Sequence, residues 1–557
     1  MKSIKEAIEF LHSKHLLLIA IIVIAAALRL YSLDNIPPSA SLDESSIGYN
    51  AYSVVKTGGD EFGAFPLVSQ RGYDDYRRST YLLLVSPFVS VLGLNVVAVR
   101  LPAVILSILT VWALFGIARL LVKKPEGFSN LFAYLSAFFL AISPWHVYIS
   151  RIGHESNACL SFLVFAIFFF LKGLESKKYL LPSVVFFTLS MISYYSGQVL
   201  VPLLVLSLAI IYRKQLLKII FADNKSKLIT LGVLLLAIPI VWSVFSPEAL
   251  IRFRGTSTFS PSAHEKLFDQ RVLLRNKAVQ NHDIVGSIIY NQRLFPVVVL
   301  VQGYMDHFNP QWLFHNDSKG IFKAPNVGLL YPWQFPFILL GIVAFIFSKK
   351  VSRSVKFLLI FWFLLGALPA SIATQTPHAM RSYNILPTYE IFTAFAITTF
   401  VYLFYKYKLV IGVIVSILVC FSFQSFLFNY YFTFPKEQSK SFQYAYGKAL
   451  GYVLANQDKY QRVVISNTDN MFQSYMIFLY YSKYDPTLYQ KQGGTKSGGY
   501  DATHFFGKYE FRPIDFEKEK TANTLYVVNP SEMPSGASEL YVGKYLDGTK
   551  GAIVLTR

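Results

Sequence analysis

Two adjacent carboxylates, Asp43 and Glu44, lie in a segment, 34–78, that is rich in Gly, Pro, Tyr and Arg and follows the first long apolar run. An ionised carboxylate can act as a general base and take the proton from an acceptor hydroxyl or amine. The pair also has a structural interpretation, because Asp is a good N-cap and the stretch 47–55 can form a helix. Taken alone, the pair fits the structural role better. Its position beside an apolar run of spanning length favours an active-site loop.

A second acidic pair, Asp74 and Asp75, occurs in the same loop among tyrosines and arginines. Mixed charges of this kind usually form a network of ion pairs at a surface, and that is the more common role of such a cluster. In an active-site loop the pair could instead contact a substrate. Tyr49 is a further candidate for substrate binding.

Four ionisable residues follow in the sequence SPWHVYISRIGHES, at the junction of two apolar runs: His146, Arg151, His154 and Glu155. Ionisable groups near a membrane are costly unless they face a cavity or a ligand, so this turn is a candidate for function. Arg151 and His154 could bind substrate, and Glu155 could act as an acid or base. Adjacent side chains such as those of His154 and Glu155 diverge on a helix, and no metal-ligand spacing such as HExxH occurs here. We expect no zinc site, while a divalent metal cofactor is possible.

Arg381 precedes a late apolar run, in the sequence TPHAMRSYNILP. A guanidinium can bind a phosphate through two hydrogen bonds, so Arg381 is a candidate ligand for a lipid phosphate. The structural alternative is that its side chain snorkels to the membrane surface. Weaker polar candidates are Arg252, Arg254, Asp306, His307 and His315.

The composition is that of an integral membrane protein. Of the 557 residues 54% are hydrophobic and only 15% are charged, and the mean hydropathy is +0.42, whereas soluble proteins carry about 25% charged residues. The net charge of +20 comes from short basic clusters between apolar runs. Such clusters are typical of the cytoplasmic ends of membrane helices, so nucleic acid is not an expected partner. Cys159 and Cys420 both lie in apolar runs, and no disulfide framework is expected.

The apolar runs predict an all-α polytopic membrane protein with about eleven transmembrane helices and additional interfacial helices. The runs are 16–33, 100–122, 129–145, 156–174, 179–195, 198–212, 228–246, 332–348, 355–373, 388–405 and 409–430. Two shorter runs, 81–93 and 294–303, contain proline and are expected in the interface. If neither spans and the N-terminus is cytoplasmic, the basic clusters lie inside and the loops 34–99 and 247–331 lie outside. The first run is expected to be an uncleaved helix rather than a signal peptide.

The tail 432–557 is more polar and predicts a small, soluble α/β domain outside the membrane domain 1–431. Its patterns predict two helices and three strands. The helices are expected at 437–458 and 469–481, the strands at 462–466, 525–528 and 552–556, and a Gly-rich loop at 493–499. The glycines of this loop do not have a phosphate-binding spacing.

The order of these motifs resembles the membrane glycosyltransferases of the C superfamily, and most closely the branch of the protein O-mannosyltransferases and the lipid A aminoarabinose transferase. The resemblance covers roughly residues 10–430. It rests on LDESSIGYNAY after the first helix, ArgLeuPro at 100–102, SPWHVYISRIGHES and HAMRSYNILP, in that order.

The resemblance implies a helical membrane fold with an outer cavity under the first loop. It also implies transfer of a monosaccharide from a polyprenyl-phosphate donor to a protein, glycolipid or polysaccharide acceptor, with inversion. By the family's pattern Asp43 corresponds to the catalytic acidic residue and Glu44 completes the pair. Glu155 lies near the position of a second acid, and Arg381 would hold the lipid phosphate.

Two other classes of protein are also compatible with the sequence: a lipid-linked sugar transporter or flippase, and a non-catalytic membrane scaffold. Transporters usually show repeated halves and ionisable groups near the bilayer midplane. Here the polar residues are concentrated on one face, and an inert scaffold gives no reason for the acidic loop. The expected location is the cell membrane, with a cytoplasmic N-terminus and an extracytoplasmic C-terminal domain.

Overall fold

The computed structural model describes residues 2–73, 75–224, 227, 247, 257–258, 261–315, 323–496, 502–519 and 523–556. The chain forms two compact units, each built from several stretches of sequence. The first unit comprises Met1–Leu28, Leu106–Ile149 and Ser156–Gln424, and the second comprises Arg29–Ile105, Ser150–Glu155 and Ser425–Arg557. The acidic loop and the C-terminal tail therefore belong to the same compact unit.

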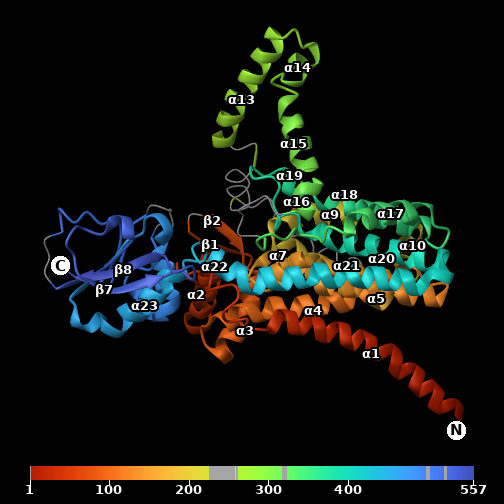
Figure 1. Cartoon of the computed structure of the whole chain (residues 1–557), viewed down its shortest axis with the longest axis horizontal. Helices are drawn as coiled ribbons and strands as arrows, with labels where there is room; N and C mark the ends of the chain where they lie inside the picture. The colour runs from red at the N-terminus through yellow and green to blue at the C-terminus, as the bar shows by residue number, and fades with distance from the viewer. Residues whose placement is uncertain are drawn as a thin grey trace. The chain divides into compact units, whose positions relative to one another are not determined.

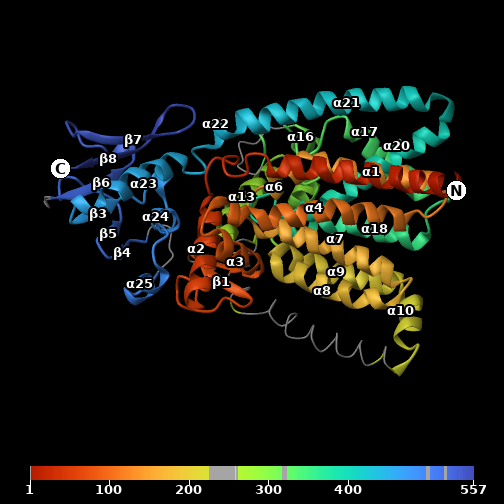
Figure 2. The ribbon, with the colours of Figure 1, turned by 90° about the horizontal axis from the view of Figure 1, so that it is seen from below.

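The first unit is mainly a bundle of apolar helices (Figures 1 and 2). The helices that lie wholly or mostly in it include α1 (Lys2–Leu30), α4 (Val96–Leu121), α5 (Glu126–Ile142), α6 (Pro144–Ser150), α7 (Glu155–Gly173), α8 (Leu180–Ser193), α9 (Tyr195–Ile211), α10 (Arg213–Ile220), α17 (Gln334–Phe347), α18 (Arg353–Gly366), α20 (Leu386–Leu403) and α21 (Lys408–Phe428). Helix α20 packs against α17 and α5. Gly341 of α17 permits a close approach, because a Cβ there would lie 2.0 Å from the carbonyl oxygen of Phe392. Small residues let membrane helices pack closely in this way.

Every predicted apolar run that falls on described residues coincides with a helix. In the described part of the chain, five helices are long and apolar enough to cross a membrane, or up to seven if each of two bent pairs is one span. The five are Val96–Leu121, Glu155–Gly173, Arg353–Ser371, Tyr383–Leu403 and Tyr405–Gln438. The run 228–246 lies outside the described residues. A polytopic helical membrane fold is thus confirmed, whereas the number of eleven spans stays a prediction.

The two short runs expected in the interface are both helical. They are α3 (Thr80–Leu92), with 13 residues, and α15 (Phe295–Asp306), with 12 residues. At 1.5 Å per residue these helices are about 20 and 18 Å long, which is less than the hydrocarbon thickness of about 30 Å. Helix α15 follows α13 (Pro261–Gln280) and α14 (Ile284–Ile289), and the three project from the bundle of the first unit (Figure 1).

The second unit contains a six-stranded mixed sheet with the order β4-β5-β3-β6-β8-β7. Strand β3 (Arg462–Ile465) runs parallel to its neighbours β5 (Tyr509–Phe511) and β6 (Thr524–Val528). The strands β4 (His504–Phe506), β7 (Glu539–Lys544) and β8 (Lys550–Thr556) extend the sheet in antiparallel pairings. Helix α23 (Tyr444–Asn456) packs against β7 and β8.

The C-terminal region, residues 432–557, combines helices with a small sheet, as predicted. The positions of its elements differ in part from the predicted ones. Strands β3, β6 and β8 match the three predicted strands, whereas β4, β5 and β7 were not predicted. The long helix expected at 437–458 is divided into α22 (Phe434–Gln438) and α23, because Gln443 has a left-handed φ of 48° that interrupts the helix. Part of the loop 493–499 lies outside the described residues. The domain boundary at 431/432 stays a prediction.

The acidic loop contributes helix α2 (Leu42–Thr57) and the hairpin of β1 (Ser69–Gly72) and β2 (Asp75–Arg78). Helix α2 packs against α3 and against α24 (Ser474–Ser482) and α25 (Pro486–Lys491) of the C-terminal region. A glycine is required at position 48, where a Cβ would lie 2.7 Å from the ring of Tyr480. This close approach places α2 directly on α24.

Candidate active site

The acidic pair lies in the first turn of α2. Ser41 is the N-cap, and it forms a capping box with Glu44: the Ser41 hydroxyl accepts from the Glu44 backbone N–H (3.2 Å), and Glu44 Oε2 accepts from the Ser41 N–H (2.8 Å). The cap that the sequence suggested at Asp43 is therefore made by Ser41 instead. Both carboxylates lie at the positive end of the helix dipole, which favours their ionised forms.

Glu44 is buried and has a complete set of hydrogen-bond donors. Its side chain is 1% exposed and forms an ion pair with Arg100, with Arg100 Nε 2.7 Å from Oε1. Oε1 also accepts from the backbone N–H of Gly153 at 2.9 Å. Although burial alone would raise the pKa of Glu44, Arg100 and the backbone N–H groups of Gly153 and Ser41 hold it below its ordinary value. These contacts suit a residue that fixes the loop rather than one that transfers a proton.

Arg100 organises the backbone that leads to the pair. Its guanidinium is fully buried and donates to the carbonyl oxygens of Leu33 (2.9 Å), Pro37 (3.0 Å) and Ser39 (2.6 Å) as well as to Glu44. Hydrogen bonds to a charged donor contribute more than those between neutral groups. The ArgLeuPro motif thus anchors the acidic loop to the start of α4.

Asp43 is the accessible member of the pair. Its side chain is 43% exposed, and Oδ1 accepts from Nη2 of Arg77 at 2.5 Å. Arg77 lies on β2 and is 5.3 Å from the centroid of the Tyr73 ring, while the Tyr73 hydroxyl donates to the Leu42 carbonyl. Burial disfavours the charge of Arg77, but Asp43 and Glu155 raise its pKa above the ordinary value. The hairpin therefore directs one cation at the carboxylate of Asp43.

His154 and Glu155 lie together at the start of α7. His154 Nε2 is 3.3 Å from Glu155 Oε2, and both side chains are at least nine-tenths buried. The expectation that these adjacent side chains diverge was wrong, because His154 precedes the helix, whose first residue is Glu155. Glu155 also acts electrostatically on Arg77. Asp43, Arg77, His154 and Glu155 thus form one cluster of ionisable side chains.

Arg151 is fully buried and holds the end of α1. Its guanidinium donates to the carbonyl oxygens of Arg29 (2.8 Å), Tyr31 (2.7 Å) and Ile36 (2.8 Å), and Nε donates to the Tyr430 hydroxyl (3.2 Å). A cation near the last carbonyls of a helix is favourable. The predicted role of Arg151 in substrate binding stays a prediction, and its observed contacts include backbone carbonyl groups and the side chain of Tyr430.

The remaining candidates of the loop differ in their surroundings. Tyr49 is fully buried, and its ring packs edge to face against Tyr489. Asp74 lies outside the described residues. Asp75 opens β2, opposite Gly72.

Arg381 belongs to the first unit, in the turn before α20. Its backbone N–H donates to Nδ1 of His378 at 3.4 Å, and its buried Nη1 has no hydrogen-bond partner within the described residues. His307 lies nearby, where it accepts at Nε2 from the His378 N–H (3.1 Å), and burial lowers the pKa of His307 to about 4. An unpaired guanidinium nitrogen beside a neutral histidine is available to an anion.

The remaining candidates lie in different places. His146 is buried, and its ring stacks on that of Tyr383 with 6.1 Å between the ring centroids. Asp306 accepts a hydrogen bond from Thr376, and His315 is exposed at the end of α16 (Pro310–Phe314). Arg252 and Arg254 lie outside the described residues.

Glu61 is a buried carboxylate that the sequence did not indicate. Glu61 is fully buried after α2 and accepts hydrogen bonds from Asn50 Nδ2 (3.1 Å), the Tyr475 hydroxyl (3.2 Å) and Thr495 Oγ1 (2.6 Å). Burial raises its pKa to about 7. No local pattern could identify it, because two of its partners are more than 400 residues away in the chain.

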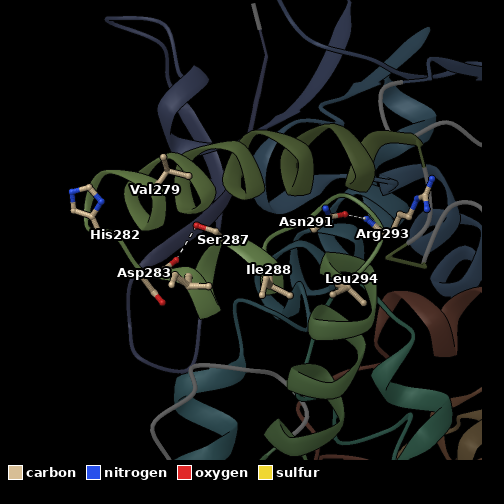
Figure 3. A pocket seen from close by; sticks show the side chains of 9 residues that line it. Val279, His282, Asp283, Ser287, Ile288, Asn291, Arg293 and Leu294 are labelled. Carbon is tan, nitrogen blue, oxygen red and sulfur yellow. Dashed lines mark hydrogen bonds between the residues drawn. The ribbon is translucent and has the colours of Figure 1, made fainter.

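A pocket of about 700 Å³ lies on the projecting helices, between the end of α13, α14 and the start of α15 (Figure 3). Its polar groups include Asp283, which caps α14 by accepting from Gly286, and Asn291, which accepts from the Arg293 N–H. None of the predicted site residues lines it. Over the described part of the chain, no group of three or more His, Cys, Asp or Glu residues could hold a metal ion, so a divalent metal stays a possibility from the sequence only.

Comparison with known proteins gives one family match. Residues 80–242 match the model of the dolichyl-phosphate-mannose-protein mannosyltransferase family. This segment includes Arg100, Arg151, His154 and Glu155. A comparison with curated protein sequences finds no match.

Two similar solved structures are of ArnT from Cupriavidus metallidurans. The structure bound to undecaprenyl phosphate has a TM-score of 0.51 and 11% identity, and the match covers 96% of this chain and 97% of that chain. The apo structure has a TM-score of 0.50 and 11% identity, with 99% and 98% covered. At this identity the likeness establishes the fold.

A third structure is the archaeal oligosaccharyltransferase AglB from Archaeoglobus fulgidus, in complex with an inhibitory peptide and a dolichol-phosphate. It has a TM-score of 0.47 and 13% identity, and the match covers 84% of this chain. This chain spans 63% of the length of that protein. The family match and the ArnT-like fold together confirm the resemblance found in the motifs, that of a membrane glycosyltransferase with the GT-C fold in the O-mannosyltransferase and ArnT branch.

Proposed function

We propose that the protein transfers a monosaccharide from a polyprenyl-phosphate donor to an acceptor on the outer face of the membrane, with Asp43 as the general base. The observation that carries this proposal is the asymmetry of the acidic pair. Glu44 is buried and bonded to Arg100 and Gly153, whereas Asp43 is accessible and paired with Arg77. Asp43 can therefore contact an acceptor as it stands. Glu44 could do so only if it lost its bonds to Arg100 and Gly153.

In the proposed reaction the acceptor oxygen or nitrogen attacks the anomeric carbon of the donor sugar. A new bond forms between this atom and the anomeric carbon, and the bond from that carbon to the phosphate oxygen breaks. The acceptor proton passes to the carboxylate of Asp43, and polyprenyl phosphate leaves with the bonding electron pair. Direct displacement inverts the configuration of the anomeric carbon.

Four further residues support this chemistry. Arg77 fixes the orientation of the Asp43 carboxylate, and Glu155 with His154 supplies a second acidic group in the same cluster. Arg381, whose Nη1 has no partner among the described residues, is the proposed ligand of the phosphate. Preorganised cations at a departing phosphate stabilise the charge that develops in the transition state.

The outward orientation of the site follows from the distribution of basic clusters. If the lysine and arginine clusters between the helices are cytoplasmic, the acidic loop and the C-terminal sheet lie outside. The acceptor is a protein, a glycolipid or a polysaccharide.

The test uses the full chain in lipid bilayers with a panel of radiolabelled polyprenyl-phosphate sugars, and measures release of polyprenyl phosphate. We expect release by the wild type and a loss of about 100- to 10,000-fold in Asp43→Asn, because general bases contribute factors of this size. Asp34→Asn is the matched control, since Asp34 is an exposed aspartate of the same loop, and it should keep wild-type activity.

Two results would contradict the proposal. Unchanged release in Asp43→Asn would remove the assigned role of this residue. Movement of labelled lipid across the bilayer without consumption of any donor would instead identify a transporter.

A further inference from the structure

The surroundings of Glu61 join the acidic loop to the C-terminal helices within the second unit. Asn50 of α2 bonds to it twice: Nδ2 donates to the carboxylate (3.1 Å), and Oδ1 accepts from the Glu61 N–H (2.8 Å). From the C-terminal side, Tyr475 of α24 and Thr495 after α25 donate to Oε2. One buried carboxylate thus bridges two parts of the chain that are distant in sequence.

The side chains that donate hydrogen bonds to this carboxylate are neutral, namely an amide and two hydroxyls. The titratable side chains that act on it are Asp60 in its own loop, Tyr49 of α2, Tyr475 of α24 and Tyr489 of α25, and Tyr73 of the hairpin lies close enough to interact. Burial without a charged hydrogen-bond donor favours the protonated form of a carboxylate, and burial raises the pKa of Glu61 to about 7.

Further hydrogen bonds join α2 and its flanking residues to α24 and α25. Gln490 of α25 donates to Ser53 Oγ (3.2 Å), Thr57 Oγ1 (3.1 Å) and the Asp60 carbonyl (2.9 Å). At the other end of α2, Ser39 Oγ and the Tyr481 hydroxyl are 2.7 Å apart. The C-terminal helices therefore hold α2 along its length, and α2 carries Asp43 in its first turn.

From this geometry we infer that Glu61 is a positioning residue, through which α24 and α25 set the orientation of α2 and so the placement of Asp43. The inference rests on the proposed function for its effect on catalysis. It gives the C-terminal region a specific role, since Tyr475 and Thr495 donate to a buried carboxylate that follows α2, and Gln490 adds hydrogen bonds to the same end of the helix. Misplacement of a reacting group by about 1 Å can lower a rate by about 100-fold.

The main test compares Glu61→Ala with Glu61→Gln. Glutamine reproduces the shape and neutral charge of a protonated glutamate, so Glu61→Gln should keep kcat within about threefold of the wild type, whereas Glu61→Ala should lower kcat by about 10- to 100-fold. The KM for the lipid donor should stay unchanged in both. Glu517→Ala, which removes an exposed carboxylate of the C-terminal region, is the matched control.

A second measurement is independent of activity. Spin labels at Lys56→Cys and Lys459→Cys, two exposed positions on α2 and after α23, report the distance between the helix and the C-terminal sheet. The labels require a background without the exposed Cys420. The distance distribution should broaden in Glu61→Ala and return to the wild-type width in Glu61→Gln.

The outcomes separate the two proposals. A broadened distribution together with a reduced kcat in Glu61→Ala supports the inference. An unchanged distribution, or damage by Glu61→Gln equal to that by Glu61→Ala, overturns it. If Asp43→Asn leaves transfer unchanged, the proposed function fails whatever the spin labels report.

Discussion

The two ends of α2 are held by buried carboxylates in opposite ways. Glu44, in the first turn, is paired with the buried cation Arg100, and its pKa lies below the ordinary value. Glu61, just after the last turn, is bonded to an amide and two hydroxyls, and burial raises its pKa to about 7. The same helix is therefore fixed by a charged contact at the end that carries Asp43 and by a neutral network at the other.

This difference indicates which of the two contacts should depend on pH. A buried ion pair is costly to break, because removal of one partner leaves an unpaired charge in a low dielectric. A neutral network loses only hydrogen bonds, but its carboxylate can become ionised within the physiological pH range. We expect the Glu44 end to be rigid near neutral pH and the Glu61 end to be sensitive to pH.

Removing the charge of Glu44 should have the largest effect. Glu44→Gln leaves the buried guanidinium of Arg100 without a counter-charge, and we expect a loss of about 3–5 kcal/mol in the free energy of unfolding. The measurement is chemical unfolding of the purified protein in detergent micelles. Glu517→Gln is the control. A loss similar to that of the control would mean that Arg100 is satisfied by its carbonyl partners alone.

The pH dependence of stability should separate the two carboxylates. Because the folded protein binds a proton at Glu61 more tightly than the unfolded chain, stability should fall as pH rises from 4.5 to about 7. At about 1.4 kcal/mol per pKa unit, the decrease is about 3 kcal/mol. Glu44 contributes with the opposite sign: its stabilisation is present above its unfolded pKa and is lost as pH falls through its lowered folded value.

Unfolding of the wild type and of Glu61→Gln across this range is the check. The variant cannot ionise at this position, so its stability should depend less on pH between 4.5 and 7. Parallel curves for the two proteins would show that another group causes the dependence.

Removing one neutral donor should have a smaller effect. Thr495→Val deletes the hydroxyl that donates to Glu61 Oε2 at 2.6 Å but keeps the shape of the side chain. Glu61 Oε2 keeps its bond from Tyr475, but the buried Tyr489 hydroxyl, 2.7 Å from Thr495 Oγ1, loses this partner. We expect a loss of about 1–3 kcal/mol, the usual penalty for a buried polar atom left without a partner. The unfolding midpoint measures it, and Thr549→Val, at an exposed turn threonine bonded to Asp547, is the matched control. A loss no larger than that of the control would mean that Tyr475 and Asn50 suffice.

The sequence predicted the helices well, but it predicted the roles of the site residues only in part. Long apolar runs predicted the helices, because burial in a membrane imposes one uniform requirement on every residue of a span. The motif LDESSIGYNAY drew attention to Asp43 and Glu44, but not to their different roles. The burial of Glu44 depends on Arg100 and on Gly153, which are 56 and 109 residues away.

Other features depended on contacts that no local pattern encodes. Strands β4 and β5 have only three residues each, too few for an alternating pattern to be recognised. The pairing of His154 with Glu155 was missed because the start of α7 was not known to within one residue, and helix boundaries are hard to derive from sequence. No sequence pattern pointed to Glu61, since its partners Tyr475 and Thr495 come from the C-terminal region.

The smallest expected effect concerns the cap of α2 and sharpens the comparison at its charged end. Ser41→Ala removes the hydroxyl that accepts from the Glu44 N–H but leaves the bonds of the Glu44 carboxylate to Arg100 and Gly153 in place. We expect a loss of about 1 kcal/mol in unfolding free energy, the usual value for an N-cap serine. Ser90→Ala, at an exposed serine of α3, is the control. If Ser41→Ala instead costs as much as Glu44→Gln, the cap and the ion pair act as one unit, because the carboxylate then needs the capping box to stay in reach of Arg100. In that case the first turn of α2 is stabilised by a network rather than by a single charged contact.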